Sequence, residues 1–312
     1  MRGSQCLTVM LLVLGAACGG ESRSQVRQAG PEAADGECGV GSLGDPTIGC
    51  SPLVTLAAGD YHTCGILTDG AVACFGWNEH GESAPPSGTF VTIAAGSAHN
   101  CGVRTDATLA CWGDDSYGQA SPPDGSFKAI AAGRWHSCGV RTDGTVECWG
   151  LDQAGQVRPS AGTFVELDGG SAFTCGLRTD RTLACWGAAD HGVSTPPSGT
   201  FKGLVLDSER GYAITEDDDV VSWGHDETPD LPSVKLSSLA PASDYACGLL
   251  PNGTVTCWGD PPFRNESPGG MYSAIAGGLR HHCVLDAAGA ARCWGIDDYG
   301  EASPPALTFR TF

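Results

Sequence analysis

AAGRWHSCGVRTDGTVECWG, at residues 131–150, decides the fold, because close variants of this stretch recur along the chain. Its Thr142-Asp143-Gly144 segment predicts a type I turn followed by a glycine with positive φ, the usual three-residue hairpin loop. Antiparallel pairing around that loop places Cys138 directly opposite Cys148. Opposed Cβ atoms lie about 4.5–5.5 Å apart, close to the roughly 3.8 Å that a disulfide needs. The stretch therefore predicts a hairpin closed by its own disulfide.

The same pair of cysteines, ten residues apart, recurs in six of seven units that are about 37 residues long. The predicted disulfides are Cys64–Cys74, Cys101–Cys111, Cys138–Cys148, Cys175–Cys185, Cys247–Cys257 and Cys283–Cys293. In the fifth unit Tyr212 and Ser222 stand at the two cysteine positions. The joint loss favours a disulfide, since one leftover thiol is a liability in an oxidising compartment.

Zinc is the alternative interpretation of these cysteines, because a histidine often precedes the first cysteine of a pair by two residues. These histidines are His62, His99, His136 and His281. Each unit lacks a fourth ligand, and paired CxxC knuckles are absent. The pattern therefore favours disulfides, and we expect no metal and no cofactor. The same slot holds Phe173, Arg210 or Tyr245 in other units, which is typical of a packing position and not of a catalytic one.

Each unit adds a strand upstream of the hairpin, such as FKAIAAG from Phe127, and a Trp-Gly after the second cysteine. The connectors contain prolines, which exclude a central strand. Seven units of three to four strands predict an all-β fold, a seven-bladed β-propeller of ~37-residue repeats with intra-blade disulfides. An open β-solenoid is the alternative. The propeller is favoured because residues 309–312 repeat the start of a first strand and can close a ring beside residues 53–56.

Residues 1–18 read as a signal peptide, because Arg2 is followed by an apolar run and then by small residues, too short to span a membrane. The segment resembles a bacterial lipoprotein signal in which Cys18 is lipidated, and ordinary secretion with cleavage nearby is the alternative. Residues 19–51 predict a flexible tether in which Cys38–Cys50 closes a small loop. Residues 52–312 form the propeller. We expect an extracytoplasmic protein, either an outer-membrane or cell-surface lipoprotein or a secreted one.

The pattern AAG-x-x-H, CG[LV], DG, CWG and G-Q, from about residue 52 to residue 312, resembles the regulator of chromosome condensation repeat family. Within that family it is similar to the secreted bacterial propellers of the β-lactamase-inhibitor type. The resemblance implies a seven-bladed propeller used for binding. The paired cysteines and short connectors depart from the eukaryotic members. This departure, together with the signal peptide, argues against guanine-nucleotide exchange on a small GTPase, the activity implied by analogy.

No catalytic fingerprint stands out: G-x-S-x-G, H-E-x-x-H, P-loop and dinucleotide motifs are absent from the sequence. The formal net charge of −19 argues against nucleic acid and anionic lipid as partners. We therefore expect a monomeric, non-enzymatic protein that binds a protein or cell-envelope ligand, including an enzyme to be inhibited, and meets the membrane only through an N-terminal lipid. A propeller hydrolase or lyase with a site in the central channel is the alternative.

The strand order places the loops before the histidine slots and the segments after Trp-Gly on one rim of the ring. Tyrosine, tryptophan and arginine are enriched at interface hot spots. The predicted binding residues on this rim are Tyr61, Arg134, Trp135, Arg280, Asp114 and Asp115. Calcium binding by the acidic residues is an alternative, but Asp-x-x-Gly alone is more typical of a solvated turn.

Overall fold

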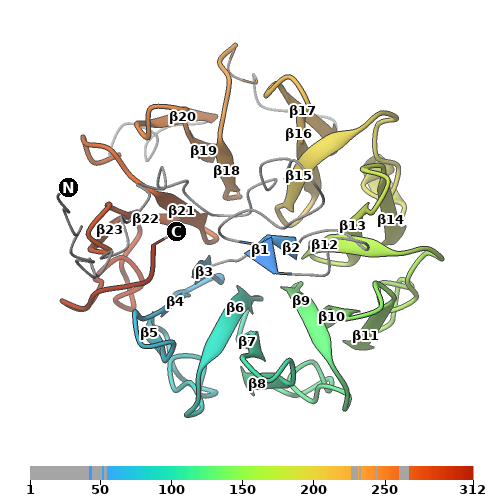
Figure 1. Ribbon diagram of the computed structural model, residues 1–312, viewed down its shortest axis with the longest axis horizontal. Helices are drawn as coiled ribbons and strands as arrows, with labels where there is room; N and C mark the ends of the chain where they lie inside the picture. Colours follow the sequence, from blue (N-terminus) through green and yellow to red (C-terminus); the bar gives the residue numbers. More distant parts are fainter. Residues whose placement is uncertain are drawn as a thin grey trace, which may run out of the picture.

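Seven antiparallel sheets of three strands each surround a central axis as the blades of a closed propeller, shown in Figure 1. This computed structural model describes residues 42–43, 51–52, 55–225, 231, 233–243, 245–259 and 267–311. The first strand of each blade lies nearest the axis, and β1 (Ser42–Leu43) pairs with β2 (Ser51–Pro52) at the centre of the ring. The predicted seven-bladed fold is confirmed, and the alternative prediction of an open β-solenoid is wrong because the blades form a closed ring.

The strands follow one another around the ring in chain order, and the described connectors add no fourth strand to any blade. Among the described residues, one 3-10 turn, η2 (Asp190–Gly192), lies in the connector between blades 4 and 5. The blades are: blade 1, β3 (Leu56–Ala58), β4 (His62–Ile66), β5 (Val72–Gly76); blade 2, β6 (Phe90–Ala95), β7 (His99–Arg104), β8 (Leu109–Gly113); blade 3, β9 (Phe127–Ala132), β10 (His136–Arg141), β11 (Val146–Gly150); blade 4, β12 (Phe164–Gly169), β13 (Phe173–Arg178), β14 (Leu183–Gly187); blade 5, β15 (Phe201–Leu206), β16 (Arg210–Thr215), β17 (Val220–Gly224); blade 6, β18 (Ser238–Pro241), β19 (Tyr245–Leu249), β20 (Val255–Gly259); blade 7, β21 (Ala274–Gly277), β22 (His281–Leu285), β23 (Ala291–Gly295).

The hairpin register of every cysteine-bearing blade is the predicted one. In blade 3, Cys138 lies opposite Cys148 in the ladder of β10 and β11, and Gly144 of the turn has a φ of +88°. All six intra-blade disulfides are formed, with Cα atoms 4.0–4.1 Å apart. Each crosslink closes a loop of ten residues, which in the chain-entropy model is worth about 3 kcal/mol.

The disulfides lie in the hydrophobic layers between blades. Cys138 and Val140 of blade 3 pack in one cluster with Phe164, Leu167 and Trp186 of blade 4. The sulfur atoms are therefore part of the core that joins neighbouring sheets, and burial of these side chains stabilises the ring by removing apolar surface from water.

Blade 5 fills the place of its missing disulfide with a phenol ring. Tyr212 lies opposite Ser222 in the ladder, and the tyrosine is 1% exposed. Its hydroxyl donates a hydrogen bond to the Asp207 carboxylate at 3.3 Å, and the carboxylate also accepts the backbone N–H groups of Glu209 and Arg210. Burial raises the pKa of Asp207 to about 6 and also raises the pKa of Tyr212. In blade 5 the buried tyrosine ring therefore fills the space that a disulfide fills in the other blades.

Residues near the end of the sequence complete blade 1. The Phe309 amide donates to the Gly289 carbonyl of blade 7 at 2.9 Å, and the Arg310 amide donates to the Ile66 carbonyl of blade 1 at 2.7 Å. Phe309 is 1% exposed and takes the place that Phe90 takes in blade 2, so residues 308–310 supply the start of a first strand that β3 continues. The segment therefore adds to the N-terminal strand and does not replace it.

The predicted signal peptide, most of the tether, and the cysteines Cys18, Cys38 and Cys50 lie outside the described residues, so these remain predictions. Within the described part of the chain, no helix combines the length and apolar character needed to cross a membrane.

Candidate binding rim

Two sets of loops lie side by side on one side of the ring, and we call this surface the rim. One set joins the first and second strands of each blade, and the other follows each aromatic-Gly pair at the end of the third strand. In the six blades where both loops are described, the residue after the glycine donates its backbone N–H to a carbonyl of the first loop. These bonds are Trp77 to Tyr61, Asp114 to Ala98, Leu151 to Trp135, Ala188 to Ala172, His225 to Glu209 and Ile296 to Arg280, at 2.8–3.2 Å.

Three aromatic rings meet on the rim where blade 7 joins blade 1, and we call Tyr61, Trp77 and Tyr299 the seam cluster. The Tyr61 ring centroid lies 5.5 Å from that of Tyr299 and 6.1 Å from that of Trp77, both edge to face. The Trp77 and Tyr299 centroids are 6.2 Å apart. Such edge-to-face contacts between rings are favourable beyond the area they bury. The predicted Tyr61 is thus part of a patch built from two blades.

Arg134, Trp135 and Tyr117 form a second aromatic group, on blades 2 and 3. The Arg134 guanidinium lies over the Trp135 ring, 4.5 Å from its centroid, and the Tyr117 ring centroid is 6.0 Å from that of Trp135. Tyr117 and Tyr299 occupy the same position of their connectors, one residue before a glycine, so each connector tip reaches the next blade. The structure brings Arg134 and Trp135 together and places them two blades away from Tyr61.

Asp114 and Asp115 organise their own connector. Asp114 accepts hydrogen bonds from Ser116 and from the Gln119 side chain, and Asp115 accepts them from Ala120 and Ser121. Partial burial alone would raise the pKa of Asp114, but the hydrogen bonds from Ser116 and Gln119 and the charge of His80 together lower this pKa below its ordinary value. In the described residues no three potential ligands gather as a metal site would require.

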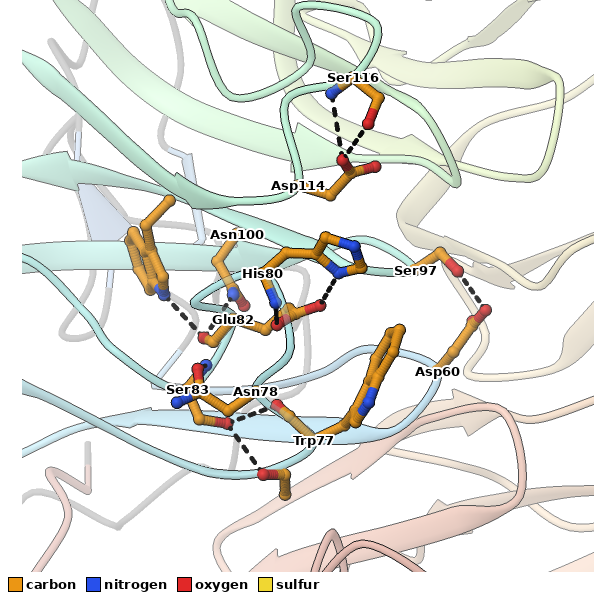
Figure 2. A network of polar contacts seen from close by, with 12 residues as sticks. Asp60, Trp77, Asn78, His80, Glu82, Ser83, Ser97, Asn100, Asp114 and Ser116 are labelled. Carbon is orange, nitrogen blue, oxygen red and sulfur yellow. Dashed lines mark hydrogen bonds and ion pairs between the residues drawn. The ribbon is translucent and has the colours of Figure 1, made fainter.

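A polar network beneath the rim joins blades 1 and 2, as Figure 2 shows. The buried Glu82 carboxylate accepts the backbone N–H of His80 at 2.8 Å and lies 3.0 Å from its Nδ1, and this hydrogen bond raises the pKa of His80. The Glu82 carbonyl accepts the Asn100 side-chain amide and the Trp112 indole N–H, at 3.0 and 2.9 Å. The rim loops of these blades are therefore held in fixed positions.

The histidines that precede the cysteines join one blade to the next. In each case Nε2 lies within hydrogen-bond distance of a side-chain oxygen of the following blade, and we assign Nε2–H as the donor. These contacts are His62 to Asn100 at 2.9 Å, His99 to Ser137 at 2.8 Å, His136 to Thr174 at 2.7 Å and His281 to Thr63 at 2.7 Å. The three hydroxyl partners accept this bond because each donates its own hydrogen to a carbonyl of the preceding connector. We call these four contacts the histidine latches.

The latch histidines are buried and neutral. Burial lowers the pKa of His62, and lowers that of His99 and His281 to about 3 and that of His136 to about 4. Where the slot holds Phe173, the next blade has Gly211, and where it holds Tyr245, its hydroxyl lies 2.9 Å from Nδ1 of His282. The residue two positions before the first cysteine of one blade therefore varies together with the residue that faces it in the next blade. This internal pairing is a signal that the sequence contains and that sequence reasoning missed.

Sequence reasoning also missed Trp77 and Tyr299. Trp77 follows a Phe-Gly where the other units have Trp-Gly, and Tyr299 lies in an acidic connector that indicates only a solvated turn. The available signal was the variation at the connector tip, where His80, Tyr117, Ala154, His191 and Tyr299 hold one repeat position.

Comparisons with known proteins agree with the architecture. The model of the regulator of chromosome condensation (RCC1) repeat matches residues 54–82, 90–119 and 127–156, which span most of blades 1 to 3. A search of curated proteins found no match. Among solved structures, the chain is similar to the CRINKLY WD40 ectodomain of the receptor kinase ACR4 from Arabidopsis thaliana, with a TM-score of 0.71 and 22% identity over 82% of this chain and 99% of that one.

Two further structures show the same fold. The entire ectodomain of the receptor kinase CR4 from Physcomitrella patens has a TM-score of 0.67 and 26% identity over 77% of this chain and 72% of that one. Yeast RCC1 (Prp20), in a structure bound to Kap60, has a TM-score of 0.58 and 15% identity over 71% of this chain and 73% of that one. The three matched repeats and the common hairpin register of the seven blades support a β-propeller built from repeats of the regulator of chromosome condensation (RCC1) type.

Proposed function

We propose that this propeller is a non-catalytic, extracytoplasmic binding protein that recognises a protein or cell-envelope ligand through its rim. One observation carries the proposal: two groups of aromatic side chains lie on the same rim, at loop positions that differ from blade to blade. Tyr117 is 49% exposed and Tyr299 is 55% exposed. Exposed aromatic residues on a rigid scaffold are typical of binding surfaces.

Disulfides support the extracytoplasmic part of the proposal. Six of them are formed in the described blades, and disulfides persist in oxidising compartments and are rare where thiols are kept reduced. Two of the similar solved structures are receptor ectodomains. Together with the predicted signal peptide and Cys18, they favour a protein that is secreted or held at a membrane surface by a lipid.

The state of the histidines supports binding rather than catalysis. A general base must reach its substrate and have a pKa near the working pH. The latch histidines instead bond to the next blade, and burial keeps their pKa values well below neutrality. An inhibitor of a secreted or periplasmic enzyme is the sharpest form of the proposal, because a ring of rigid loops can cover the surface around an active site.

The test is capture of partners from cell-envelope extract by wild type and by the double variant Tyr61→Ala/Trp135→Ala. Met271→Ala is the matched control, because this side chain is 73% exposed and lies beside the turn of blade 6 on the opposite rim. Loss of a specific partner in the rim variant but not in the control supports the proposal. Equal capture by all three proteins contradicts it.

A further inference from the structure

We infer that the seam cluster receives an arginine or lysine side chain from a partner with a basic surface. The inference rests on the proposed function, because it names the chemistry of the partner that the rim would bind. It concerns Tyr61, Trp77 and Tyr299 only, and it separates this cluster from the Trp135 group on blades 2 and 3.

The three rings of the seam cluster are held in place by their backbone. The Trp77 N–H donates to the Tyr61 carbonyl at 2.9 Å, and the Trp77 carbonyl accepts the Ser83 hydroxyl at 2.9 Å. The Tyr299 N–H donates to the buried Glu301 carboxylate at 2.8 Å. A preorganised surface loses little conformational entropy on binding, which raises the affinity available from few contacts.

Carboxylates flank each ring in the sequence. Asp60 precedes Tyr61, Glu79 follows Trp77 by two residues, and Asp298 precedes Tyr299. Asp60 accepts a hydrogen bond from the Ser97 hydroxyl, drawn in Figure 2. Glu79 and Asp298 are exposed, and no other described residue forms a hydrogen bond or ion pair with them. Aromatic rings on loops that also carry carboxylates favour a cation, and the chain carries a net charge of −19.

The chain itself shows how its aromatic rings accept a guanidinium. Arg104 lies over Phe90, Arg141 over Phe127 and Arg178 over Phe164, with Cζ 4.7–5.5 Å from the ring centroids. Trp135 on the rim has Arg134 at 4.5 Å. Within the described residues, no lysine or arginine lies over Tyr61, Trp77 or Tyr299. The Trp135 ring therefore already contacts an arginine of its own chain, whereas the rings of the seam cluster are open to a cation from a partner.

The direct test uses a defined probe, the peptide acetyl-(Gly-Arg)4-amide, with acetyl-(Gly-Glu)4-amide as the matched acidic control. Binding is measured by calorimetry at pH 8, which lowers the protonated fraction of His80, whose ring centroid lies 5.4 Å from that of Trp77. We expect Tyr299→Ala to weaken binding of the arginine peptide about five- to thirtyfold, the range for a partly desolvated cation–π contact, and Tyr299→Phe to keep it. Tyr117→Ala, at the same repeat position of blade 2, should bind like wild type.

Three outcomes would overturn the inference. Equal affinity of wild type and Tyr299→Ala for the arginine peptide would show attraction by net charge alone. Equal binding of the acidic and the arginine peptides would show that the surface binds peptides without selecting their charge. Sedimentation in which wild type self-associates and Tyr299→Ala does not would assign the cluster to a second copy of this chain.

The extract experiment separates this inference from the proposed function. If Tyr61→Ala/Trp135→Ala loses its partner while Tyr299→Ala retains it, the rim function stands and the seam inference fails. If neither variant loses a partner, the proposed function fails, and the peptide measurement decides the cation site by itself.

Discussion

Acid is expected to destabilise the propeller through its buried histidines. Burial lowers the pKa of His99 and His281 to about 3 and that of His136 and His282 to about 4, whereas histidine in an unfolded chain titrates near 6.5. Between these values the unfolded chain binds a proton that the folded chain does not. As the pH falls, the free energy of unfolding therefore decreases by about 1.4 kcal/mol per pH unit for each histidine, or about 5.4 kcal/mol per pH unit for the four. This stability is intact above about pH 6.5 and is lost as the pH falls to about 4 for His136 and His282 and to about 3 for His99 and His281.

The variant His136→Phe isolates one histidine, and Phe173 at the same position of blade 4 shows that the fold accommodates a phenyl ring there. Combining it with Thr174→Gly reproduces the Phe173 and Gly211 pair of the next blade boundary and leaves no hydroxyl without its donor. Urea unfolding, followed by tryptophan fluorescence, gives the free energy of unfolding at each half unit from pH 5 to pH 7.5. We expect the slope of the double variant to be smaller than that of wild type by about 1.4 kcal/mol per pH unit below pH 6.

Other titrating groups cancel in this comparison because they are common to both proteins. The control is His80→Asn, since the pKa of His80 is raised by its hydrogen bond to Glu82. His80 stabilises the fold below its ordinary pKa and ceases to do so as the pH rises through its folded value, so removing it should change the slope with the opposite sign. If the free energy of unfolding changes with pH by the same slope in wild type and in the His136 variant, His136 is not a neutral side chain in the folded protein.

Three further predictions follow from the blade cores and the ring closure. Cys138→Ala/Cys148→Ala should lower the free energy of unfolding by about 3 kcal/mol, measured by urea unfolding, and no loss would contradict a formed disulfide. Phe309→Ala should lower the free energy of unfolding by about 3–5 kcal/mol, because this ring is buried. Hydrogen-exchange mass spectrometry should show faster exchange of the blade 1 amides, and an equal change in all blades would contradict the prediction. Burial raises the pKa of Asp207 to about 6, so this carboxyl stabilises the fold below its ordinary pKa near 4 and loses that contribution as the pH rises through 6. The thermal midpoint of Asp207→Asn should therefore rise relative to that of wild type between pH 4 and pH 6.5, and a constant difference over this range would contradict the shift.

The sequence predicts well whatever depends on contacts inside one blade. The facing of Cys138 and Cys148 follows from the length of one turn and the two-residue period of a strand, both of which are local. The number of blades follows from counting such units. The role of residues 308–310 was partly predictable, because Phe309 repeats a pattern seen in Phe90 and Phe127.

Contacts between blades could not be predicted in the same way. The approach of Tyr299 to Tyr61 exists only because the ring closes, and no local rule brings a connector of blade 7 to a loop of blade 1. The sequence predicts the histidine slots as packing positions, and in the structure these histidines are buried, but their partners depend on how far adjacent sheets are rotated. Similarly, the acidic character of Asp114 indicated a charged rim, whereas its hydrogen bonds are to its own connector.

The short disulfide loops have a consequence for how the chain reaches its folded form. Each crosslink joins cysteines ten residues apart, so each can oxidise soon after its own hairpin emerges from a ribosome or translocon, without waiting for distant sequence. Correct pairing is favoured because the nearest partner is also the one with the lowest cost of loop closure. The contacts between blade 7 and blade 1, among them the joining of Phe309 to blade 1 and the His281–Thr63 latch, require all seven units to be present. Assembly would therefore proceed as a series of independent oxidations followed by one late, chain-spanning step, and until that step blade 1 would present an open strand edge prone to pairing with other chains.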